Sequence, residues 1–187
     1  EENQTALYTA YSGGADGVYP ITETLLQGNN FKSNSTGISF TMNQRHFAGM
    51  EILDNEFHNQ SGSSIVLGGG GYGPYLHSAR IAGNWVTDCG GSGIRAGRFY
   101  SAGTNGPIKG SAANPMPEYP LSVENNLVER CPGSPLNLDT GNVKTQTRGN
   151  VLVDNEGSGS SLVVGQKSYN GLITGNVIVS AEDGITL

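Results

Sequence analysis

A pattern of short apolar runs separated by turn residues recurs along this chain of 187 residues. Its clearest copy is ARIAGNWVTDCGGSGIRAG, from Ala79 to Gly97. Aligning the copies on the asparagine of the first turn places six asparagines in one column: Asn29, Asn55, Asn84, Asn126, Asn150 and Asn176. The intervals between them are 26, 29, 42, 24 and 26 residues. Repeats of this length predict a solenoid.

The columns around these asparagines are apolar, as a repeat that faces a core must be. Three positions earlier stand Leu26, Ile52, Ile81, Val123, Thr147 and Ile173. Two positions later stand Phe31, Phe57, Val86, Val128, Leu152 and Ile178. About ten positions later stand Ile38, Ile65, Ile94, Leu136, Leu162 and Ile185. Only Thr147 departs from the pattern, so each copy is predicted to supply three core-facing segments.

The apolar runs are short, β-branched or aromatic, and bounded by Gly, Asn and Ser, which predicts strands. Three strands per turn of about 25 residues, with an asparagine at a fixed corner, resemble the right-handed parallel β-helix of the pectate-lyase-like superfamily. The resemblance covers residues 26–187 and predicts an all-β solenoid of about six coils in which the asparagines form a structural ladder. Residues 1–25 are predicted to form a leading segment and a partial coil.

The two ends of the chain both look like pieces of coils. Gly184 to Leu187 match a closing strand, and Asp16 to Tyr19 resemble the closing strand of an earlier coil. Because a solenoid end exposes strand backbone and core, we expect continuation of the chain or end-to-end self-association beyond Leu187.

Composition restricts the class of partner. The 29 glycines suit a fold with several tight corners in each coil, and no apolar run approaches the ~20 residues of a membrane span. The net charge of −6 argues against nucleic acid, which calls for a clustered basic face.

Two cysteines occupy the same position in adjacent copies. Cys89 and Cys131 each follow their asparagine by five residues, so stacked coils bring them within reach of a disulfide. Stacked free thiols would give the same sequence, but we favour the disulfide because we expect a secreted or cell-surface protein. In the position directly before the cysteines, successive copies have Asp88, Arg130 and Asp154, which predict a ladder of alternating charges on the surface.

Sequons predict possible N-glycosylation at Asn3, Asn34 and Asn59.

Function is expected on the closing strands and on the loops that follow them, since long loops on a rigid scaffold often carry function. Alternation points Ile94 and Ala96 inward and Arg95 outward. The longest loop is the insertion at 98–120, rich in Gly and Pro. The predicted substrate-binding residues are aromatic, basic or polar and would suit an acidic glycan: Arg45, His46, Tyr72, Tyr75, Tyr100, Asn137 and Asp139.

The resemblance implies a groove along the closing strands that binds a polysaccharide, often a polyuronate. A lyase needs a base and a cation that neutralises the substrate carboxylate, and the candidates for these catalytic roles are Arg95, His77, Arg98 and Lys109. A hydrolase needs two carboxylates, for which only Asp139 and Glu118 are candidates, so this alternative is weaker. No cofactor is evident; Ca²⁺ is possible, although the acidic residues are dispersed.

Three functions follow from these observations. The first is a carbohydrate-active or carbohydrate-binding β-helix acting on an acidic polysaccharide, with β-elimination as the reaction if it is an enzyme. The second is a non-catalytic, adhesive glycan-binding module that uses the same groove. The third is a structural repeat segment of an extracellular fibre. The sequence leaves open whether the chain is an enzyme.

Overall fold

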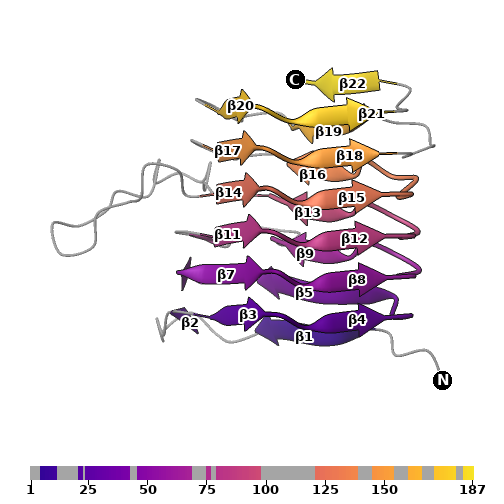
Figure 1. Ribbon diagram of the computed structural model, residues 1–187. Coiled ribbons are helices and arrows are strands. Elements are labelled where there is room, and N and C mark those ends of the chain that lie inside the picture. Colours follow the sequence, from indigo (N-terminus) through magenta and orange to yellow (C-terminus); the bar gives the residue numbers. More distant parts are fainter. Residues whose placement is uncertain are drawn as a thin grey trace, which may run out of the picture.

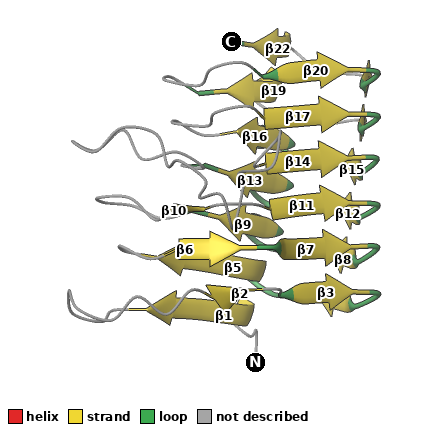
Figure 2. Ribbon diagram, turned by 90° about the vertical axis from the view of Figure 1, so that its left-hand side faces the viewer, coloured by secondary structure: helices red, strands yellow, loops and turns green. Residues whose placement is uncertain are grey.

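The computed structural model shows an all-β parallel solenoid (Figure 1). It describes the following residues: 5–11, 21–22, 24–42, 46–68, 75–76, 79–97, 121–138, 145–153, 160–165, 171–179 and 183–187. The strands among them stack into three long parallel sheets, which form three sides of the molecule (Figure 2). No helix in this part of the chain is long and apolar enough to cross a membrane.

The sheet before the asparagine corner is called the first sheet. It contains, in chain order, β3 (Leu25–Gln27), β7 (Met50–Leu53), β11 (Ala79–Ala82), β14 (Leu121–Glu124), β17 (Thr145–Arg148) and β20 (Leu172–Thr174). The sheet after the corner is called the second sheet. It contains β4 (Asn30–Lys32), β8 (Glu56–His58), β12 (Trp85–Thr87), β15 (Leu127–Glu129), β18 (Val151–Val153) and β21 (Val177–Val179).

The closing sheet completes each coil. It contains β1 (Thr5–Tyr11), β5 (Thr36–Met42), β9 (Ile65–Leu67), β13 (Ile94–Ala96), β16 (Leu136–Leu138), β19 (Ser160–Val164) and β22 (Asp183–Thr186). A small fourth sheet is formed by β2 (Ile21–Thr22), β6 (His46–Ala48) and β10 (Tyr75–Leu76). Four coils are described without a gap, fewer than the six expected: 24–42, 46–68, 79–97 and 121–138. Beyond these four coils, strands on all three sides continue the stack as far as β22.

The strand that precedes the first full coil differs from the expectation. β1 pairs in parallel with β5, with Leu7 opposite Ile38, so Thr5–Tyr11 holds the closing position that the sequence analysis assigned to residues 16–19. Residues 16–19 lie outside the described part of the chain. The expectation rested on a match of only four residues, whereas β1 is a strand of seven residues, TALYTAY.

The core is built from the apolar columns. Ile52, Ile81 and Val123 are completely buried under the first sheet, as is Phe57 under the second. The Phe57 ring stacks on Phe31 of the preceding coil, with ring centroids 4.8 Å apart. Each fully buried side chain of this size stabilises the fold by about 1.5–3 kcal/mol, so the repetition of the columns is itself the main source of stability.

The asparagine column forms the predicted ladder, and Asn84 shows the pattern. Its Nδ2 donates to Asn126 Oδ1 at 2.9 Å and to the Ile52 carbonyl at 2.9 Å, while its Oδ1 accepts from Nδ2 of Asn55 at 3.0 Å. Side-chain hydrogen bonds of this kind join every successive pair of the six asparagines. The ladder thus satisfies polar groups that the corner buries.

The residue before each asparagine turns the chain with a left-handed backbone. Gly83 has φ +67° and Asn125 has φ +53°, a region that Gly, Asn and Asp adopt at least cost. A Cβ atom on Gly83 would lie 2.3 Å from Asp54 Oδ1. Because that oxygen is the end of an exposed side chain that can move, the left-handed backbone is the main reason for glycine at this position.

A second corner follows the second sheet and contains the cysteines. Cys89 and Cys131 form a disulfide between adjacent coils, with their Cα atoms 4.7 Å apart, which confirms the favoured alternative. The preceding coils place the buried amides of Asn34 and Gln60 near this corner. Gln60 Nε2 donates to the carbonyls of Phe31 and His58, at 3.0 Å each. The same corner is therefore cross-linked by hydrogen bonds in one part of the solenoid and covalently in another.

Candidate functional site

Arg95 lies where the sequence analysis placed it. It is exposed on β13 between two fully buried neighbours, Ile94 and Ala96. In the closing sheet it is paired with Val66 of β9 and Asn137 of β16. The structure thus brings Arg95 and Asn137 together on one outward face, as predicted.

The other predicted site residues fall largely outside the described part of the chain. This holds for Arg45, Tyr72, His77, Arg98, Tyr100, Lys109 and Asp139. For His46 and Tyr75 the backbone is described, and the two residues are direct partners in the β6–β10 pair. The catalytic assignments to Arg95, His77, Arg98 and Lys109 therefore stay predictions.

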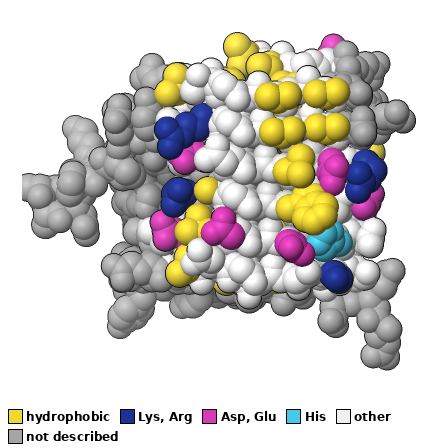
Figure 3. Space-filling view, viewed as in Figure 1, with side chains coloured by type: hydrophobic (Ala, Val, Ile, Leu, Met, Phe, Trp, Pro, Cys, Tyr) yellow, Lys and Arg dark blue, Asp and Glu magenta, His cyan; other side chains and the backbone are white. Residues whose placement is uncertain are grey.

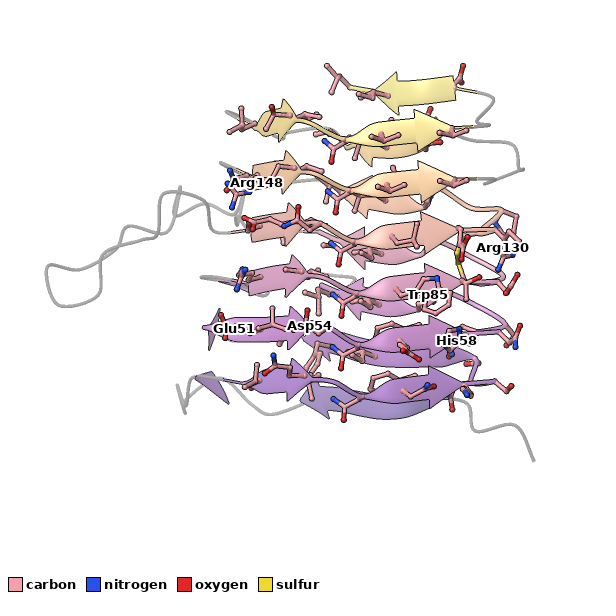
Figure 4. All side chains as sticks on the ribbon, viewed as in Figure 1. Glu51, Asp54, His58, Trp85, Arg130 and Arg148 are labelled. Atoms are coloured by element: carbon pink, nitrogen blue, oxygen red, sulfur yellow. A yellow bond between two sulfur atoms is a disulfide. The ribbon has the colours of Figure 1, made fainter. Side chains whose placement is uncertain are left out.

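A cluster that the sequence analysis did not select lies on the outward face of the second sheet. Trp85 of β12 is 41% exposed, and Figure 4 shows its ring beside His58, with Arg130 near the edge of the same face. The indole Nε1 donates to Glu129 Oε1 at 2.9 Å. The His58 ring meets the indole edge to face, with centroids 5.1 Å apart. These two contacts, from the coils on either side, fix the orientation of the Trp85 ring.

Two groups of interacting charged side chains lie beside this ring. Glu129 Oε2 contacts Arg130 Nη1 at 3.2 Å, and Arg130 Nε donates to Asp88 Oδ1 at 2.6 Å. On the other side, His58 Nε2 lies 3.2 Å from Glu56 Oε2. We call these residues the Trp85 cluster: Glu56, His58, Trp85, Asp88, Glu129 and Arg130. Within it an aromatic ring is framed by three carboxylates and one guanidinium.

The electrostatics of the cluster are set by the Asp88–Arg130 pair. The hydrogen bond from Arg130 lowers the pKa of Asp88, and a second one from Thr87 adds to it against the opposing effect of burial. The pKa of Arg130 is raised, first of all by the same bond to Asp88. Part of the predicted charge ladder is thereby confirmed. Its third member, Asp154, lies outside the described residues.

The Trp85 cluster continues into an apolar area along the solenoid axis. Strand pairing places Leu127 directly after Trp85, followed by Val151 and Val177. Val153 and Val179 form a parallel row two residues further along each strand. We call the four valines the valine array: Val151, Val153, Val177 and Val179. Figure 3 shows hydrophobic side chains gathered on the part of this face formed by β18 and β21.

The outward face of the first sheet carries an ion network of a different kind. Glu124 is 5% exposed and contacts Arg148 Nη2 at 3.1 Å and Arg80 Nε at 4.0 Å. Burial raises the pKa of this carboxyl, but hydrogen bonds from Ser122 and Arg148 outweigh that effect and lower it. Both arginines are thus engaged by one carboxylate, so this network is best explained as structural.

The structure also bears on the predicted glycosylation sites and on whether the acidic residues could hold a metal ion. Asn34 is 6% exposed, which argues against a glycan there, whereas Asn59 is exposed and Asn3 lies outside the described residues. Among the residues whose positions are described, no group of three or more His, Cys, Asp or Glu is arranged to hold a metal ion.

Trp85 was missed because the sequence analysis followed the closing strands. A signal was present: Trp85 is the single tryptophan of the chain and stands one residue before the buried Val86, in a position that alternation points outward. A large aromatic residue on the solvent side of a strand merits attention as a binding group.

No family model matches the chain, and neither a curated protein nor a solved structure matches it.

Proposed function

We propose that this chain is a secreted or cell-surface glycan-binding β-solenoid and that the Trp85 ring is the centre of its binding surface. The observation that supports this proposal best is the exposed indole, held in one orientation by Glu129 and His58 on a flat sheet face. A ring that is already oriented loses little conformational freedom when a ligand packs on it.

The chemistry of the cluster matches that of a sugar. A pyranose ring offers an apolar face of C–H groups and a rim of hydroxyls, so it packs on an aromatic face and hydrogen-bonds at its edges. Trp85 supplies the aromatic face. Glu56 and Glu129 supply carboxylate oxygens, which accept hydrogen bonds from hydroxyls. Binding sites typically combine such an apolar surface with a few placed polar groups.

The charges of the cluster favour a neutral glycan. Asp88 and Glu129 both contact the single guanidinium of Arg130, and Glu56 adds a third carboxylate. A polyuronate would bring its own carboxylates close to these groups, and like charges repel. The acidic polysaccharide and the lyase reaction predicted around Arg95 stay predictions for the closing sheet, separate from this surface.

The disulfide supports the proposed location. Disulfides form and persist in oxidising compartments and at cell surfaces, and they are rare in the cytosol. The Cys89–Cys131 bond is therefore what a secreted or surface-exposed β-solenoid would contain.

Fluorescence and calorimetry test the proposal. Because Trp85 is the only tryptophan, its emission reports directly on the proposed site. We expect saturable quenching or a spectral shift with neutral β-linked gluco-, xylo- or manno-oligosaccharides, and little response to pectate or alginate. In calorimetry, Trp85→Ala is expected to weaken binding at least tenfold, which corresponds to about 1.4 kcal/mol.

A matched control separates the site from general surface apolarity. Leu25 is 55% exposed on the first sheet, so Leu25→Ala removes a large exposed apolar side chain from another face and should leave binding unchanged. The proposal would be refuted if Trp85→Ala and the wild type bound equally well and thermal melting showed that both proteins are folded. Binding of no neutral glycan would also refute it, and end-to-end filaments in electron microscopy would then favour the structural-fibre alternative.

A further inference from the structure

We propose that the ligand of this surface is a linear neutral polysaccharide that lies along the solenoid axis, from Trp85 across Leu127 to the valine array. This inference rests on the proposed glycan-binding function and extends it, since it assigns the direction of the chain, the length of the site and the class of glycan.

The strand register makes the surface continuous. Trp85, Leu127, Val151 and Val177 occupy one outward row on four successive strands, each paired in parallel with the next. Glu129, Val153 and Val179 occupy the neighbouring outward row. Neighbouring strands are about 4.8 Å apart, a step similar to the length of one sugar in an extended chain. A linear glycan parallel to the axis would therefore advance by about one sugar per coil.

The polarity of the surface changes along this path. Among the described residues of this face, the charged groups stand around Trp85, and the outward positions of β18 and β21 are all valines. Val177 is 50% exposed and Val179 is 45% exposed. A charged polymer laid on these valines would lose hydration without gaining a partner, which is costly. The C–H faces of neutral sugars are weakly hydrated, so their contact with the valines carries no comparable loss of hydration.

The stiffness of the array favours a flat ligand. Valine is restricted at χ1, so the four side chains present a fixed surface and lose little rotamer freedom on contact. Unbranched sugars in an extended chain have flat faces that fit such a surface. The other occupant that this apolar face could accept is a second copy of the chain, and the experiment separates the two.

The test measures affinity against ligand length. Titrating a disaccharide, a tetrasaccharide and a hexasaccharide of the neutral glycan that binds best should give an affinity that rises at least tenfold over the series. Val177→Thr/Val179→Thr keeps side-chain shape and strand preference but adds hydroxyls. This double variant should lose at least fivefold for the hexasaccharide and less than twofold for the disaccharide. Leu172→Thr, an exposed position on the first sheet in the same coil, is the matched control and should bind like the wild type.

Three results would overturn the inference while leaving the proposed function intact. The first is a Trp85-dependent affinity that does not change with ligand length. The second is normal hexasaccharide binding by the double threonine variant. The third is a dimer in sedimentation velocity that this variant abolishes, which would assign the array to self-association. If no neutral glycan binds at all, the proposed function itself fails together with the inference.

Discussion

Cys89 and Cys131 are 42 residues apart in the chain and yet joined, across the corner that follows the second sheet. Reduction should therefore release a long loop in the unfolded chain. In the chain-entropy description, a loop of this length corresponds to about 4 kcal/mol of stability. Urea unfolding of the same protein with and without reductant should show a lower midpoint for the reduced form.

The double variant Cys89→Ala/Cys131→Ala is the control for this prediction. Its unfolding midpoint should not respond to reductant. A wild-type protein whose midpoint is also unaffected by complete reduction, verified by thiol titration, would show that the bond adds nothing to stability.

Replacing an asparagine of the ladder by alanine should cost the most stability in the buried middle of the ladder. Asn84→Ala leaves the backbone N–H and Nδ2 of Asn55 without the oxygen that accepts from both. It also removes the side-chain donor to Oδ1 of Asn126, which keeps only the backbone N–H of residue 84. Because each buried polar group that loses its partner costs about 1–3 kcal/mol, we expect a loss of at least about 3 kcal/mol in urea unfolding.

Asn29 provides the comparison within the same ladder. It is exposed, so water replaces the bonds that Asn29→Ala removes, and the expected loss is below about 1 kcal/mol. Equal losses at Asn29 and Asn84 would contradict the view that burial gives the ladder its strength.

Thr147 offers a stabilising substitution. It replaces Val or Ile in a core column, is completely buried, and its hydroxyl has no hydrogen-bond partner among the described residues. Thr147→Val keeps the shape and removes the unpaired hydroxyl, so the free energy of unfolding should rise by about 1 kcal/mol. Thr174→Val, on an exposed position of β20, should change it by less than about 0.5 kcal/mol. Destabilisation by Thr147→Val would indicate that the hydroxyl is paired in solution.

Acid should destabilise the fold through two carboxyls. The pKa of Asp88 is lowered by Arg130, and that of Glu124 is lowered by Ser122 and Arg148 against its burial. A carboxyl with a lowered pKa in the folded state adds stability above its ordinary value of about 4, and this stability is lost as the pH falls through the lower folded value. Urea midpoints should therefore fall below about pH 4.

The arginine partners supply the test of this assignment. Arg130→Met and Arg148→Met should each flatten the decline of the urea midpoint with acidification, since each removes a group that lowers a carboxyl pKa. Unchanged acid profiles in both variants would assign the pH dependence to other carboxyls.

The fold was predictable because every coil repeats the same pattern of apolar core positions and a corner asparagine. Phe57, Ile81 and Asn84 each belong to a column whose members meet the same environment, so six weak local signals add up to one strong one. The leading segment had no such support, and the match to residues 16–19 was too short to locate the closing strand correctly. The disulfide stayed ambiguous because stacked thiols and a bridge need the same two cysteines.

The candidate site was less predictable because it does not repeat. Arg95 and Asn137 were placed correctly by alternation and register, which are properties of the fold. Trp85 acquires its importance from Glu129 and His58, which lie in different coils. The repeat places the three residues on neighbouring strands, but whether their side chains meet depends on rotamers across two strand boundaries and not on a periodic pattern.

The connections after the closing strands differ greatly in length while the strands themselves keep their register. β13 ends at Ala96 and β14 begins at Leu121, whereas β16 ends at Leu138 and β17 begins at Thr145, and all four strands pair with their neighbours without a shift. Loop closure entropy grows only slowly with length. Protein engineers could therefore insert foreign peptides at this corner and display them at regular intervals along a rigid rod.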